Sequence, residues 1–225
     1  MRSLFAKYDR LVLFDTETTG LLYHADEIIE FAAVVVEMQN GEPVVVEEYD
    51  ELISLTPGNR VPPEIEKLTG ITNEALAERG VPKSKVCADF ARMIAGNTLL
   101  LAYNAHFDLS FLFYMLLRDG DISCLKGKDK LDLLTVYKDR HSYPHKLCNA
   151  IEVYGLSDQV QNSHRAIDDV IATVAVMDKM EQERDDLPRY INLFGYNPKY
   201  GISGKAIGSV TYKPQPFDPP QPLYF

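Results

Sequence analysis

The sequence predicts an α/β domain with a mixed β-sheet. Three apolar, β-branched segments follow one another near the N-terminus with short links, which favours an antiparallel meander. Later strand-like segments alternate with segments of helical periodicity, an order typical of strands connected by helices. With 225 residues, of which 46% are hydrophobic and 25% charged, the chain suits one large domain with a sizeable core.

The strands of the meander are expected at residues 11–14, 27–36 and 44–55. The first is a continuous apolar run, which is typical of a strand buried on both faces, and it stops at Asp15. Asn40-Gly41 predicts a turn between the second and third strands. A fourth buried strand is expected at 98–103, and a short fifth at 130–134.

Helices are expected where capping residues or helical periodicity occur. Pro62 and Pro63 open a short helix that Gly70 closes, and Thr72 or Asn73 caps a second. Longer helices are predicted at 85–95, around 108–116, at 147–154 and at 165–184. The helix around 108–116 is expected to bury Leu109, Leu112, Phe113 and Leu116. The helix at 165–184 is expected to bury Ile167, Val170, Ile171, Val174 and Met177.

The composition changes from Asp186 onward, where seven of the 13 prolines lie between residues 188 and 222. We therefore expect a domain at residues 1–185 and an extension at 186–225 that packs on the domain or is partly disordered. Three scattered cysteines, Cys87, Cys124 and Cys148, predict reduced core thiols in a cytoplasmic protein rather than disulfides or a zinc site. No apolar run is long enough for a membrane span, so no membrane partner is expected.

Asp15 and Glu17 lie two residues apart at the end of the first strand, so their side chains share one face. A buried pair of like charges is costly unless a cation lies between them, usually a hard divalent ion with oxygen ligands. The alternative is a solvated strand end followed by a Thr/Gly turn. The formal charge of −10 argues against a nucleic-acid partner, unless metal ions neutralise such carboxylates and attract phosphate.

Further acids begin two of the helices. Asp108 lies in the first turn of one, where the helix dipole alone would also favour it. His164 precedes another helix that carries Asp168 and Asp169, an arrangement suited to a base and a ligand, although a capping His and a solvated helix face are the alternatives. Asp168 can pair with Arg165 at helical spacing. Asp169 shares its face with the small residues Ala166, Ala172 and Thr173.

These three segments together resemble the three motifs of the DnaQ-like 3′→5′ exonucleases, the DEDDh family within the ribonuclease H-like fold. Asp15-Thr16-Glu17-Thr18-Thr19-Gly20 is similar to D-x-E-T-T-G, residues 104–108 to N-x-x-F-D, and His164-x-Ala166-x-x-Asp169 to H-x-A-x-x-D. The motifs occur in the family's order, over roughly residues 8 to 185. The third motif makes Asp169, rather than Asp168, the ligand.

The resemblance implies a ribonuclease H-like exonuclease fold with a central mixed sheet of about five strands flanked by helices. It also implies two divalent ions, Mg²⁺ or Mn²⁺. Asp15, Glu17 and Asp169 would hold the first ion, and Asp15 would bridge to the second with support from Asp108. His164 would be the general base, because an imidazole titrates near neutrality.

By the same resemblance, Thr18 and the backbone of Thr19, Gly20 and Leu21 would contact the 3′-terminal nucleotide. Asn104 and Phe107 would support the site, although Phe107 also suits a plain core position. The segment 137–146 interleaves cations and aromatic residues, so it is expected either to contact nucleic acid or to form a solvated loop.

The implied activity is release of nucleoside monophosphates from single-stranded DNA 3′ ends, as in the epsilon proofreading subunit of bacterial DNA polymerase III. The alternatives are an RNA-trimming 3′→5′ exonuclease and a non-catalytic module that binds nucleic acid or a partner. A DNA polymerase or sliding clamp is a further expected partner, because the last five residues, 221–225, resemble clamp-binding peptides. Pro222 departs from the usual Leu of those peptides.

Overall fold

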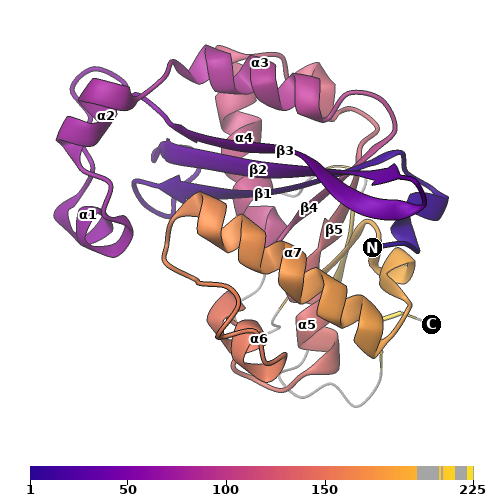
Figure 1. The fold of residues 1–225 in the computed structure, drawn as a ribbon. Coiled ribbons are helices and arrows are strands. Elements are labelled where there is room, and N and C mark those ends of the chain that lie inside the picture. Colours follow the sequence, from indigo (N-terminus) through magenta and orange to yellow (C-terminus); the bar gives the residue numbers. More distant parts are fainter. Residues whose placement is uncertain (197–207, 209, 216–221, 225) are drawn as a thin grey trace.

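The computed structural model describes residues 1–196, 208, 210–215 and 222–224. A five-stranded mixed sheet lies at its centre, in the order β3-β2-β1-β4-β5 (Figure 1). Its strands are β1 (Arg10–Thr18), β2 (Ile28–Gln39), β3 (Glu42–Leu52), β4 (Thr98–Ala102) and β5 (Asp129–Asp132). The first three form the antiparallel meander, whereas β4 and β5 continue the sheet in parallel with β1. The predicted fold class is confirmed.

Helices cover both faces of this sheet (Figure 1). The helices are α1 (Pro63–Thr69), α2 (Asn73–Arg79), α3 (Lys83–Met93), α4 (Ala105–Asp119), α5 (Leu133–Arg140), α6 (Leu147–Val153) and α7 (Ala166–Glu183). One core layer joins the sheet to α3 and α4, and the other joins it to α5, α6 and α7. Leu11 and Leu13 enter the second of these layers, while Val12 and Phe14 enter the first. The continuous apolar run therefore arises because both faces of β1 are buried.

The predicted turn and cap residues have the expected conformations. Asn40 and Gly41 both have positive φ, and Gly70 ends α1 with φ 70°. Thr72, not Asn73, caps α2, because its hydroxyl accepts a hydrogen bond from the Ala75 N–H at 3.1 Å.

Several local predictions are wrong. The fifth strand ends at Asp132 instead of residue 134, because that side chain caps α5, a helix the sequence pattern did not predict. In α4, Phe111 is buried and Phe113 only partly so. In α7, Ile171 is 40% exposed, and the buried face contains Ala166, Ala172 and Thr173. These small residues let α7 lie close to the sheet. The predicted core face consisted of large side chains, so it did not account for this close approach.

The three cysteines are free, as predicted, but only Cys87 is buried, and Cys148 is exposed rather than a core thiol. No helix in the part of the chain described above is both long and apolar enough to cross a membrane.

Residues beyond 185 contribute to both core layers where the structure describes them. Leu187, Tyr190 and Leu193 are buried in the layer of α7, and Phe194 is buried in the layer of α4. Two short parallel strands, β6 (Leu193–Tyr196) and β7 (Thr211–Pro214), form a second small sheet. The domain boundary at residue 185 stays a prediction.

Truncation after residue 185 tests that boundary. We expect a loss of about 6 kcal/mol or more in the free energy of unfolding, since each of the four buried side chains contributes about 1.5–3 kcal/mol. Chemical denaturation of the full chain and of residues 1–185 measures the difference, with Leu193→Ala as a single-site comparison. Equal unfolding midpoints for the two chains would show that the last 40 residues, from 186 to 225, are an appendage.

Candidate active site

The three motifs meet at one edge of the sheet. Asp15 and Glu17 lie in the last four residues of β1, next to the end of β4. Asp108 lies in the first turn of α4, which follows β4 after two residues, and Asp169 lies in the first turn of α7. The carboxyl ends of neighbouring parallel strands share an edge, and the first turns of both helices reach it.

The first and second motifs are linked directly by hydrogen bonds. Thr16 points to the other face of β1 from its neighbours, and its N–H and hydroxyl both donate to Asp108 Oδ1, at 3.0 and 2.7 Å. Asp108 is 2% exposed, so these two bonds fix a carboxylate that water scarcely reaches.

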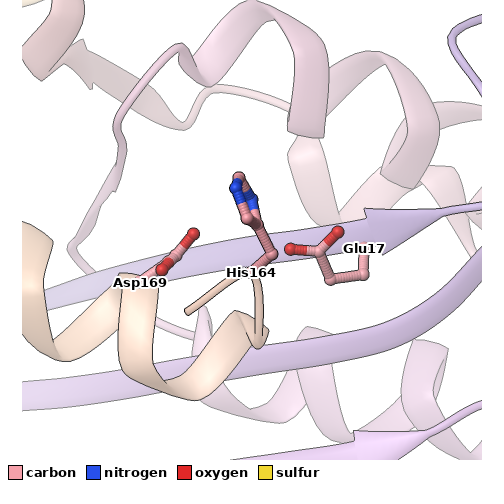
Figure 2. A group of neighbouring side chains, drawn as sticks. All are labelled: Glu17, His164 and Asp169. Atoms are coloured by element: carbon pink, nitrogen blue, oxygen red, sulfur yellow. The ribbon is translucent and has the colours of Figure 1, made fainter. Parts of the chain in front are cut away.

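In the part of the chain that the structure describes, Glu17, His164 and Asp169 form a group of potential metal-binding atoms. One ring nitrogen or carboxylate oxygen from each lies within 4.8 Å of the others (Figure 2). His164 is exposed and stands two residues before α7 with φ 58°, so it precedes the helix as predicted. The structure therefore brings the predicted base to the carboxylates predicted as ligands.

The electrostatics of the cluster are those of crowded, poorly solvated acids. Burial, followed by the charges of neighbouring carboxylates, raises the pKa of Glu17 to about 8. Burial raises the pKa of Asp108 to about 7, against the bonds from Thr16, and that of Asp169 to about 6. The pKa of Asp15 is raised well above its usual range by burial and by the charges of Asp108 and Asp169. Asp15 therefore interacts electrostatically with these carboxylates, although it is not one of the three residues whose atoms lie within 4.8 Å of one another.

One atom of the cluster is left without a partner. Asp169 Oδ1 is buried and accepts no hydrogen bond from any residue that the structure describes. A buried, unpartnered carboxylate oxygen is costly, and a cation would satisfy it. The donors are oxygen atoms with one imidazole nearby, which suits Mg²⁺ or Mn²⁺.

Hydrogen bonds stabilise the turn that follows β1. Thr18 donates its hydroxyl to the Gly20 carbonyl at 2.6 Å, and the Thr19 N–H donates to the Glu27 carbonyl at 2.9 Å. A Cβ at Gly20 would lie 2.4 Å from the Asp26 carboxylate, so a larger residue there would have to displace that side chain. Leu21, at the end of this turn, is 79% exposed.

A buried acid that the sequence interpretation missed positions the second motif. Asp132 Oδ1 accepts the N–H groups of Asn104 and Ala105, each at 3.0 Å. These bonds hold Asn104, which has φ 71°, and so begin α4 at the right point for Asp108. Phe107 is half-buried and packs on Phe111 with 4.9 Å between ring centroids.

A second missed acid positions the third motif. Glu30 of β2 is fully buried, and its carboxylate accepts from the Arg165 guanidinium and, at 2.8 Å, from the Ala166 N–H. It therefore fixes the start of α7, between His164 and Asp169. In the sequence, the signal for this role was a single acid, Glu30, within the otherwise apolar run of β2.

The segment 137–146 divides into two parts. Tyr137, Lys138 and Asp139 are buried in α5, so this half neither contacts nucleic acid nor forms the predicted solvated loop. The Arg140 guanidinium is also enclosed, and it donates to the Met180 carbonyl at 2.5 Å. In the second half, residues 143–146 line a pocket that His164 and Asp169 also line.

Comparisons with known proteins agree with this geometry. A family model described as Exonuclease matches residues 12–177. DNA polymerase III subunit epsilon of Treponema pallidum (strain Nichols) is 32% identical over 179 residues, 74% of each chain. DNA polymerase III PolC-type of Clostridium perfringens (strain 13 / Type A) is 33% identical over 186 residues, which cover 79% of this chain but only 12% of that protein.

Among solved structures, E. coli exonuclease I in complex with a dT13 oligonucleotide superposes with a TM-score of 0.67 at 21% identity. The match covers 79% of this chain and 42% of that chain. The fold is thus the ribonuclease H-like exonuclease fold, as the motifs implied.

The chain belongs to the exonuclease family. The predicted enzyme class, a 3′→5′ exonuclease, is confirmed at the level of the family, and exonucleases of this fold are metal-dependent.

Replacing Glu30 with Gln removes the charge that holds Arg165 and the start of α7. We expect kcat to fall about 10- to 100-fold, because small displacements of catalytic groups have effects of that size. Glu37→Gln is the matched control, since Glu37 also lies on β2 and pairs with Arg10, at the far end of the strand. Steady-state kinetics of both variants measure the effect. Equal kcat values would contradict the positioning role of Glu30.

The raised pKa values predict how metal affects stability. In the folded, metal-free protein the carboxyls of Glu17, Asp108 and Asp169 bind protons more tightly than in the unfolded chain. The cluster therefore lowers the free energy of unfolding as pH rises from about 4 to about 8. Mg²⁺ binds the deprotonated form, so the Tm increase that it causes should be larger at about pH 8 than at about pH 5.

Thermal melts with and without Mg²⁺ at several pH values test this dependence. Asp169→Asn should show a smaller increase in Tm at every pH. A Tm increase that is independent of pH would contradict the prediction.

Proposed function

We propose that this chain is a metal-dependent exonuclease that removes nucleoside monophosphates from the 3′ ends of DNA. The observation that carries the proposal is the meeting of four carboxylates and His164 at one edge of the sheet, with a buried Asp169 oxygen that lacks a partner. A site of this composition suits hydrolysis of a phosphodiester.

In this proposal, Asp15, Glu17 and Asp169 hold one divalent ion, and Asp15 and Asp108 hold a second. When bound, the ions supply positive charge that stabilises the attacking and leaving oxygens of an in-line displacement.

His164 accepts the proton of the attacking water. A nitrogen of its ring lies within 4.8 Å of a carboxylate oxygen of Glu17 and of one of Asp169, so the imidazole stands next to the proposed ligands. As the water oxygen bonds to phosphorus, the bond to the 3′ oxygen of the penultimate nucleotide breaks. That oxygen takes up a proton and remains on the shortened strand.

The turn at residues 18–21 receives the 3′-terminal nucleotide. Within this turn, the Thr19 N–H donates to the Glu27 carbonyl and the Thr19 hydroxyl to Asp26 Oδ1, and exposed Leu21 offers an apolar surface for the base or sugar. Asn104 and Phe107, at the start of α4, support the same nucleotide.

DNA is the proposed substrate because the relatives named above belong to DNA polymerases and the structural neighbour was solved with a DNA oligonucleotide. An RNA-trimming exonuclease is the second candidate, since the same acids would hydrolyse either backbone.

A DNA polymerase or its sliding clamp is the proposed protein partner. The names of the relatives and the sequence at 221–225 motivate it, but Gln221 and Phe225 lie outside the described residues. The full chain should bind a clamp more tightly than a chain lacking residues 217–225 in a surface-plasmon experiment. Equal binding would end the clamp part of the proposal.

The activity itself is tested with 5′-labelled single strands of DNA and RNA in Mn²⁺. We expect stepwise shortening of the DNA from its 3′ end, more slowly for the RNA. Asp15→Asn should abolish cleavage, and His164→Asn should lower kcat about 10²- to 10⁴-fold, the usual contribution of a general base. Faster loss of ribonucleotides would favour the second candidate, and an active Asp15→Asn variant would favour a non-enzymatic role.

A further inference from the structure

A pocket of about 450 Å³ opens beside the catalytic acids. Asn104, His164 and Asp169 line it, and so do Tyr143 and Lys146, which belong to the loop between α5 and α6. None of the residues that line it belongs to the turn 18–21. The pocket and the turn are therefore two separate surfaces that approach the same catalytic residues.

The loop is held in one shape by its buried residues. The Tyr103 hydroxyl donates to the His145 carbonyl at 2.8 Å, and His145 Nε2 lies 2.9 Å from the His141 carbonyl oxygen. Tyr143 is 67% exposed, with its ring edge-on to that of His145 at 5.7 Å. The loop thus brings an exposed aromatic ring and the exposed side chain of Lys146 to the pocket.

The pocket fits a nucleotide in size and chemistry. Its volume lies within the roughly 300–1,000 Å³ that is usual for small-molecule sites. An exposed tyrosine ring stacks on a base of any sequence, and a lysine pairs with backbone phosphate. In a chain with a formal charge of −10, a lysine beside a cluster of acids has a clear use in offsetting their repulsion of the substrate.

We propose that this pocket binds the nucleotide on the 5′ side of the scissile phosphate, the one whose 3′ oxygen leaves. Tyr143 stacks on its base, and Lys146 pairs with the next phosphate of the strand. The inference rests on the proposed exonuclease function, with the terminal nucleotide at the turn 18–21. It makes Tyr143 and Lys146 determinants of affinity for a strand rather than for a single nucleotide.

The test compares two substrates in Mn²⁺: a short thymidine oligonucleotide and the 4-nitrophenyl ester of thymidine 5′-monophosphate, which has no nucleotide on the 5′ side. Tyr143→Ala should raise KM for the oligonucleotide about tenfold, the effect expected for one stacked base. The change in KM for the ester should be several-fold smaller. Tyr143→Phe keeps the ring and should recover most of the affinity.

Lys146→Gln should lower the slope of log(kcat/KM) against log[salt] by about 0.7 for the oligonucleotide, the value for one lost phosphate contact on a single strand. Lys126→Gln is the matched control, because Lys126 is an exposed lysine near the opposite edge of the sheet, beside Gly96 and Asn97. It should keep the parent's slope.

Binding of the labelled oligonucleotide in Ca²⁺, measured by fluorescence anisotropy, separates the two proposals. Weaker binding by Tyr143→Ala and Lys146→Gln supports the pocket, even if the parent hydrolyses neither substrate and the exonuclease proposal fails. If the parent is active and both variants bind the oligonucleotide as it does, the pocket proposal is overturned. If Tyr143→Ala raised KM equally for the oligonucleotide and the ester, the proposal would also be overturned, because the pocket would then hold the terminal nucleotide.

Discussion

Repulsion between carboxylates at one edge of the sheet is the constraint on which the rest of the structure depends. Burial raises the pKa values of Asp15, Glu17, Asp108 and Asp169, and the charges of neighbouring cluster carboxylates raise those of Asp15 and Glu17 further. Such a cluster would separate if its backbone were free to move, because each uncompensated acid costs several kcal/mol in the order of magnitude usual for buried ions. The fold opposes this by anchoring each motif to a different part of the core.

Three anchors hold the three motifs, and each is a buried polar group. Thr16 ties β1 to Asp108, Asp132 ties the start of α4 to β5, and Glu30 ties the start of α7 to β2. Glu30 itself adds negative charge next to the cluster, since it raises the pKa of Asp15 and Glu17. Its pairing with Arg165 offsets that charge while keeping the helix in place. The site is therefore positioned at some cost in electrostatic energy.

Local patterns in the sequence predicted the sheet, most helices and the acids of the three motifs, because strand burial, helix caps and motif spacing are encoded within a few residues. The anchors were missed because they act between distant segments: Glu30 and Ala166 are 136 residues apart. Helix α5 was missed for a related reason. Its buried positions include Lys138 and Asp139, so its polarity does not follow the usual helical stripe. The position of the pocket-lining residues 143–146 likewise depends on where that helix ends.

The same repulsion governs how an acidic chain approaches a polyanion. Many of its cations are already paired, as Arg10 is with Glu37 and Arg92 with Glu47, so they add little net attraction for phosphate. Attraction must then come from whatever neutralises the acids at the sheet edge, and from stacking at nearby apolar surfaces. Metal and nucleic acid each favour binding of the other by the same free energy, since coupling between two ligands is reciprocal. If the proposed function holds, divalent ions bound at the sheet edge therefore reduce the repulsion between the acids and a nucleic-acid substrate.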